Sequence, residues 1–224
     1  MKRRFVLTLM LALPLATLHA ELTKEQSGRI TKTVGQIIGQ IHYRQTQLND
    51  EISKHHLKNY LNALDFGHMI FLQSDVDSFE KLYATRLDDQ VRFGNLRPAH
   101  QIFQRYLERL AERQQMVTAL LKKPMDFSKQ ESFNPVRDEL PWPKSADEAN
   151  ELWRKRVKFE LLADRLTYAE DGEKPDAKKV EESNAKIQRR YERLLKTMKA
   201  YEEAEILELY LSSLTRAYDP HSDY

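Results

Sequence analysis

Residues 98–123, PAHQIFQRYLERLAERQQMVTALLKK, carry the clearest structural signal in this chain. Apolar side chains recur at steps of three and four, which is the spacing of one face of an α-helix rather than the alternation of a strand. Pro98 suits a first helical turn, where its missing N–H is not needed, and Pro124 stops the helix. We therefore expect one long helix here. Its apolar face comprises Ile102, Phe103, Tyr106, Leu107, Leu110, Val117, Leu120 and Leu121.

The same spacing continues on both sides of this segment. It predicts helices over residues 22–47, between Asn49 and Gly67, between Ser74 and Gly94, between Ser145 and Glu170, over 176–200 and over 202–217. The helix after Ser145 carries Leu152, Trp153, Val157, Leu161, Leu162 and Leu166. No convincing alternating pattern of strands occurs. The expected fold class is all-α, a bundle of about seven helices.

Gly35 and Gly39 lie four residues apart in the first expected helix and form a GxxxG pair. Such a pair either lets a second helix approach closely or marks a dimer interface between membrane helices. We favour close helix approach, because no stretch after the first twenty residues reaches the length of a membrane span.

Residues 124–144 are expected to form a Pro-rich loop. Pro124, Pro135, Pro141 and Pro143 fall within this stretch, and a helix cannot contain prolines at this spacing. Phe127, Phe133 and Trp142 are expected to pin the loop onto the helices. A free domain linker is the alternative, but so many aromatic residues argue against it.

The first twenty residues have the pattern of a secretory signal peptide. Lys2, Arg3 and Arg4 precede an apolar run to Ala16, and Leu18-His19-Ala20 offers a cleavage site between Ala20 and Glu21. A membrane anchor is the alternative, but the run is shorter than about 20 residues and contains Pro14. Removing the signal changes the formal net charge from +2 to −1. Export and the absence of cysteine favour a periplasmic protein without disulfides, divided into a signal (1–20) and one helical domain (21–224).

Known catalytic and binding motifs are absent from the sequence. There is no HExxH, no P-loop, no GxGxxG and no GxSxG, and without cysteine there is no thiol nucleophile or Cys-zinc site. His55 and His56 are adjacent on a helix and point about 100° apart, so they are poorly placed to share a metal. We expect no catalytic residue, no metal and no cofactor, and the near-neutral charge gives no reason to expect a nucleic-acid partner.

Several ordered segments resemble the tail-specific (carboxy-terminal processing) proteases, over nearly the whole chain after the signal. The most specific is Asp219-Pro220-His221-Ser222-Asp223-Tyr224, which is similar to the segment that closes the N-terminal helical region of that family before its PDZ domain. The other matching segments are Tyr60–Asp65, Phe71–Val76, Lys123–Phe127, Pro141-Trp142-Pro143-Lys144, Leu152-Trp153 and Val157–Phe159.

The resemblance implies an endopeptidase with a Ser nucleophile and a Lys base that acts at the C-termini of proteins in the periplasm. Its catalytic and PDZ segments would follow Tyr224, so no residue here takes over a catalytic role. Asp219, Pro220, His221 and Tyr224, like Pro141, Trp142 and Pro143, are therefore interpreted as structural. Asp219 is expected to end the last helix, because a residue before proline is pushed out of the α region.

Three hypotheses follow. In the first, the chain is the N-terminal helical domain of a tail-specific protease. It is inactive by itself and helps to enclose protein substrates or to dock adaptor proteins and the downstream PDZ and protease domains. The second is a free-standing exported helical adaptor. The third is an exported helical bundle of unknown role.

Overall fold

The computed structural model describes residues 22–41, 47–170 and 177–219, which form eight α-helices and no strand. The helices are α1 (Lys24–Ile41), α2 (Asp50–Leu64), α3 (Gln73–Tyr83), α4 (Leu87–Phe93), α5 (Arg97–Leu121), α6 (Ala146–Glu170), α7 (Ala177–Lys199) and α8 (Glu203–Tyr218). The all-α prediction is confirmed. The signal with its cleavage site at Ala20 and Glu21 lies outside the described residues, as do Pro220, His221 and Tyr224.

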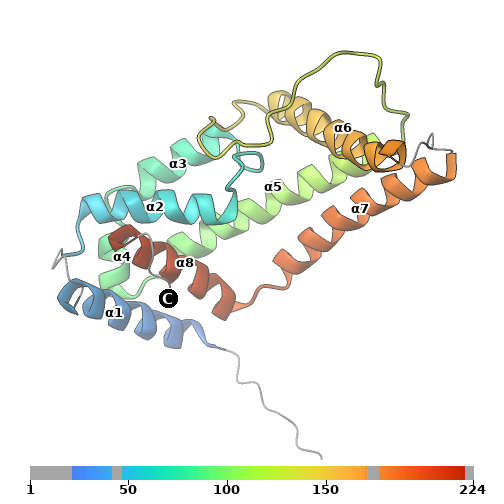
Figure 1. The fold of residues 1–224 in the computed structure, drawn as a ribbon. Helices are drawn as coiled ribbons and strands as arrows, with labels where there is room; N and C mark the ends of the chain where they lie inside the picture. The colour runs from blue at the N-terminus through green and yellow to red at the C-terminus, as the bar shows by residue number, and fades with distance from the viewer. Residues whose placement is uncertain (1–21, 42–46, 171–176, 220–224) are drawn as a thin grey trace, which may run out of the picture.

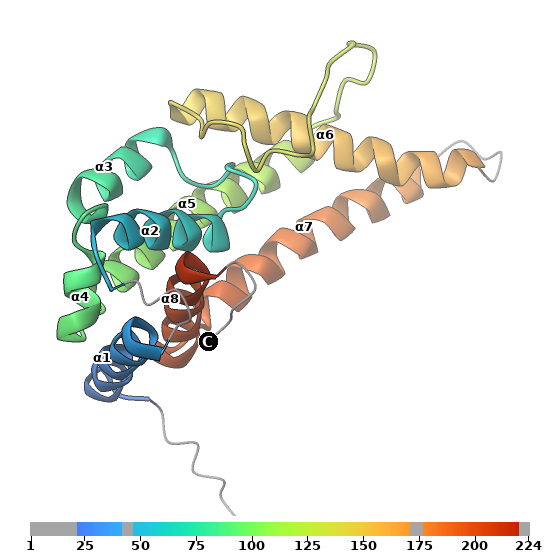
Figure 2. The same cartoon turned by 60° about the vertical axis from the view of Figure 1, so that its left-hand side comes forward.

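Helix α5 connects two parts of the molecule (Figure 1). Its N-terminal half lies with α1–α4 and α8 in a body, and its C-terminal half runs along α6 and α7, which extend together as an arm (Figures 1 and 2). Helix α8 follows the arm in sequence but returns to the body, where it packs mainly against α2. Among the described residues, no helix combines the length and apolar character that crossing a bilayer requires.

The segment between Ser74 and Gly94 forms two helices instead of the expected one, and the reason is a buried contact with α2. Ser53 Oγ donates to Asp88 Oδ1 (2.8 Å) and accepts from the backbone N–H of Asp88 (2.8 Å). Ser53 therefore satisfies a free N–H at the start of α4, where the preceding Arg86 makes no side-chain cap. The break lets Leu87 and Val91 become fully buried (0% exposed each).

The GxxxG prediction is only half confirmed. A Cβ on Gly35 would come within 2.5 Å of a Val91 side-chain carbon, so this glycine does allow close packing, whereas a Cβ on Gly39 would meet nothing within 4 Å. A close approach of two backbones instead involves Gly28, where a Cβ would lie 2.7 Å from the carbonyl oxygen of Gly94. Gly94 ends α4 with φ +67°, a conformation that favours glycine.

The interface between α2 and α8 contains a fully buried histidine. His56 is 0% exposed, its Nε2 lies 2.9 Å from the Tyr210 carbonyl oxygen, and the two rings lie 4.3 Å apart. Its Nδ1 is buried without a hydrogen-bond partner, and the Tyr60 ring packs edge-on against Tyr210 at 5.4 Å. Burial lowers the pKa of His56 from 6.5 to about 4, because the charged imidazolium would lose its hydration.

We predict that His56 makes the folded state sensitive to mild acid. Between pH 6.5 and 4 the unfolded chain binds a proton at His56 and the folded chain does not, so stability falls as pH falls. Relative to His56→Gln, the wild-type free energy of unfolding should drop by roughly 3 kcal/mol at most over this window. Urea unfolding followed by circular dichroism at several pH values measures this difference.

His55→Gln is the matched control, since His55 neighbours His56 but is exposed. Its pH profile should follow that of the wild type. A wild-type profile that runs parallel to that of His56→Gln between pH 6.5 and 4 would show that His56 does not titrate differently on folding.

Candidate functional site

Trp142, one of the three aromatic residues expected to hold the Pro-rich loop on the helices, does contact them. Its ring stacks on His68 with centroids 3.6 Å apart, and its Nε1 donates to Asp65 Oδ2 at 3.0 Å. Pro143 is buried, and its carbonyl oxygen accepts from the backbone N–H of Gln73 at 2.8 Å. Pro141 remains exposed. Trp142 and Pro143 thus contact the residues at the end of α2 and the start of α3, whereas the Pro141 carbonyl oxygen accepts from Arg137 within the loop at 3.4 Å.

Asp65, at the end of α2, is the partner that sequence reasoning missed. It is 3% exposed, and its carboxylate accepts from the consecutive backbone N–H groups of Met69, Ile70 and Phe71 at 2.9–3.0 Å. Burial raises the pKa of the carboxyl group, and these hydrogen bonds together with that from Trp142 oppose the shift. All four partners are N–H donors, an arrangement that matches an ionised, acceptor-only carboxylate.

The last helix ends as expected at Asp219. This residue has an extended backbone, with φ −147° and ψ 118°, and its N–H donates to the Thr215 carbonyl oxygen at 3.1 Å. The chain thus leaves the α conformation immediately before Pro220, as the sequence predicts. The remaining residues of this motif lie outside the described residues.

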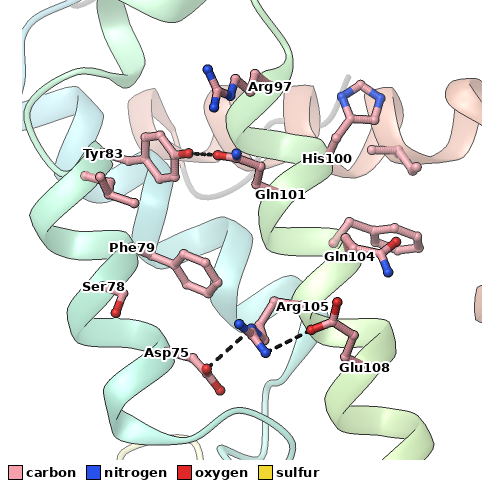
Figure 3. Close-up of a pocket in the computed structure, with 13 residues that line it drawn as sticks. Asp75, Ser78, Phe79, Tyr83, Arg97, His100, Gln101, Gln104, Arg105 and Glu108 are labelled. Atoms are coloured by element: carbon pink, nitrogen blue, oxygen red, sulfur yellow. Dashed lines mark hydrogen bonds and ion pairs between the residues drawn. The ribbon is translucent and has the colours of Figure 1, made fainter.

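A groove of about 630 Å³ lies between α3 and α5 (Figure 3). Asp75 lines it and is held by Arg109 (2.7 Å) and Arg105 (3.5 Å), and Arg105 also pairs with Glu108 at 2.8 Å. Hydrogen bonding to Asp75 and Glu112 raises the pKa of Arg109. The carboxylate of Asp75 is therefore committed to ion pairs that tie α3 to α5.

The same groove contains a serine and a histidine that do not face each other as a nucleophile and base would. Ser78 Oγ donates to the Ser74 carbonyl oxygen at 2.7 Å, a bond within α3. His100 has Nδ1 2.8 Å from the Leu96 carbonyl oxygen and Nε2 2.8 Å from Glu203 Oε2. One ring nitrogen thus faces an acceptor just before α5 and the other faces an acceptor on α8, and neither is hydrogen-bonded to Ser78.

The paired histidines of the sequence do not form a metal site. His55 is exposed and His56 is buried, so their side chains lie on different faces of α2, as expected. Across residues 22–41, 47–170 and 177–219, no group of three or more His, Asp or Glu side chains is placed to hold a metal ion.

A second surface feature lies on the arm. Phe159, Leu162 and Leu166 follow one another on the outer face of α6 and are 42%, 44% and 55% exposed. We call these three residues the α6 stripe. The sequence places them on a helix but does not show that they face outward, because the inward residues Trp153, Val157 and Leu161 share the same apolar run.

Two comparisons with known proteins match this chain to tail-specific proteases. The sequence profile described as "Tail specific protease N-terminal domain" matches residues 34–224. A protein named "Tail-specific protease" from Haemophilus influenzae is 32% identical over 200 residues, which make up 89% of this chain. The matched region is 28% of the relative, so this chain spans under a third of that protein's length.

We predict that Trp142→Phe loosens the Pro-rich loop. Phenylalanine keeps an aromatic ring beside His68 but leaves the buried Asp65 with one donor fewer, which should lower the free energy of unfolding by about 1–3 kcal/mol. Limited proteolysis should then cut first within residues 124–140. Val136→Ala is the control, because Val136 lies in the same loop and is 69% exposed. Equal stability and equal cleavage rates for wild type and Trp142→Phe would contradict the anchoring role.

Proposed function

The chain belongs to the tail-specific protease N-terminal domain family, and on that premise we propose that it is the non-catalytic helical part of a serine-type (Ser/Lys) tail-specific endopeptidase. Its role is to help enclose protein substrates or to dock partner proteins. The observation that carries the proposal is the family match over residues 34–224, which includes the motif ending at Tyr224.

The shape of the described residues supports a docking or enclosing role. The arm projects from the body, and α5 runs through both parts, so that their relative position is fixed by one continuous helix (Figure 2). Trp153 on α6 donates to the carbonyl oxygen of Met69 in the body at 2.7 Å and adds a second connection. Such a frame can hold a surface of the body and a surface of the arm at a fixed distance from each other.

A free-standing helical adaptor is the second candidate. The α6 stripe favours it, because an exposed apolar face on the arm could bind a partner without any further domain. The reading frame downstream of codon 224 distinguishes the two: a frame that encodes PDZ and Ser/Lys protease segments supports the first proposal, and an intergenic region supports the adaptor.

We predict that the purified chain does not hydrolyse casein or a peptide with an apolar C-terminus. The measurement is product formation by mass spectrometry, with a known serine endopeptidase as the positive control. Robust hydrolysis that disappears in Ser78→Ala, the variant of the groove serine, would contradict the non-catalytic assignment.

We further propose that the protein is exported to the periplasm and processed between Ala20 and Glu21. N-terminal sequencing of the exported protein should give a chain beginning at Glu21. Ala20→Arg should accumulate as the longer precursor, because the residue before a signal cleavage site must be small. Recovery of the wild-type protein in the cytoplasm with its first twenty residues intact would contradict this proposal.

A further inference from the structure

Helix α6 is apolar on two faces, and only one of them is covered. The inner face carries Trp153, Val157 and Leu161, each at most 2% exposed. The α6 stripe lies on the outer face at positions i, i+3 and i+7, and the exposed Ala163 lies within it. A helix with apolar side chains on opposite faces is typical of one that is covered on both sides. The spacing of the stripe is that of a surface against which another helix packs.

A recess lies between the α6 stripe and the Pro-rich loop. It has a volume of about 330 Å³ and is lined by the apolar residues Phe127, Phe133, Phe159 and Leu162. The Phe133 and Phe159 rings lie 5.5 Å apart, so loop and helix meet at this point. The loop side is fixed in place, because Lys158 Nζ donates to the Lys129 carbonyl oxygen at 3.1 Å and also pairs with Glu131.

The charge around the recess is positive. Its charged lining consists of Lys129, Lys155, Lys158 and Glu131. The Glu131 carboxylate is already paired with Arg154 and Lys158, whose hydrogen bonds lower its pKa to about 2. It is therefore already neutralised. Lys129 and Lys155 form no ion pair within the described part of the chain, and the nearby carboxylates of Asp126 and Glu151 act on them only at longer range. A second copy of this chain would present the same lysines, so the charge disfavours self-association through this face.

We propose that the α6 stripe and its recess form the docking site for an acidic amphipathic helix of a partner protein. The apolar face of that helix packs on Phe159, Leu162 and Leu166, one large side chain enters the recess, and its carboxylates face Lys129 and Lys155. The proposal rests on the partner-docking part of the proposed function. It is tested by binding, so its failure would leave the result of the peptidase assay unchanged.

The test uses three synthetic peptides of about 20 residues, long enough to form a helix. The first has a leucine face at i, i+3 and i+7 with flanking glutamates, the second has the same face with flanking lysines, and the third has the glutamates but serines in place of the leucines. Fluorescence anisotropy with the purified full chain should show that the first peptide binds at least about tenfold more tightly than either of the others.

Variants of the chain locate the site. Leu162→Ser with Leu166→Ser should weaken binding of the acidic peptide by about tenfold or more, because two apolar contacts are lost. Lys155→Glu should weaken binding of the acidic peptide and strengthen binding of the lysine-flanked one. Phe93→Ser is the control, since Phe93 lies on α4 in the body and is 80% exposed. Circular dichroism should give the same helix content for all variants, which change exposed or half-exposed positions.

Three results would overturn the proposal. The first is equal affinity for the glutamate- and lysine-flanked peptides, which would remove the role of charge. The second is unchanged affinity in the Leu162→Ser, Leu166→Ser variant, which would place binding elsewhere. The third is a dimer of the wild-type chain in sedimentation experiments that this variant abolishes, which would assign the face to a second copy.

Discussion

The carboxylate of Asp65 holds together segments that are far apart in the sequence. It binds three consecutive N–H groups of the connector that follows α2, and it receives the indole N–H of Trp142 from the Pro-rich loop. Met69 in that connector then accepts from Trp153 of the arm through its carbonyl oxygen. A buried carboxylate needs such donors to offset the loss of water. The site where body, loop and arm meet is thus determined by one charged group.

Helical periodicity predicted most of the fold because it depends on the spacing of apolar residues along the chain. It did not predict the break between α3 and α4, because that break depends on Ser53 and Asp88, which are 35 residues apart in sequence and meet only in the folded state. The spacing of Gly35 and Gly39 also suggested close helix packing at both, whereas the glycine that meets another backbone closely is Gly28, against Gly94. Contacts between distant segments decide such details, and spacing carries no information about them.

The same distinction applies to the functional surfaces. The aromatic and proline content of residues 124–144 was enough to predict a pinned loop, and Trp142 is indeed its anchor. In the sequence, Asp65 resembles any other acidic residue at a helix end. Only the structure shows that three backbone N–H groups donate to its carboxylate. Leu162 and Leu166 likewise read as core residues, and only the packing of Trp153 and Val157 on the opposite side shows that they face outward. The described residues thus form a frame whose arm carries an apolar surface, the α6 stripe and its recess, with lysines around it. The family to which the chain belongs is that of the tail-specific protease N-terminal domain.

Hydrogen–deuterium exchange tests most directly whether Asp65 controls this frame. If Asp65 fixes the frame, the amides of Met69, Ile70 and Phe71 exchange as slowly as those in the centres of α2 and α8, since they are released only when the whole domain unfolds. In Asp65→Asn they should exchange much faster than in the wild type. Fast exchange of these three amides in the wild-type protein, while α2 and α8 remain protected, would show that Asp65 does not hold the frame together.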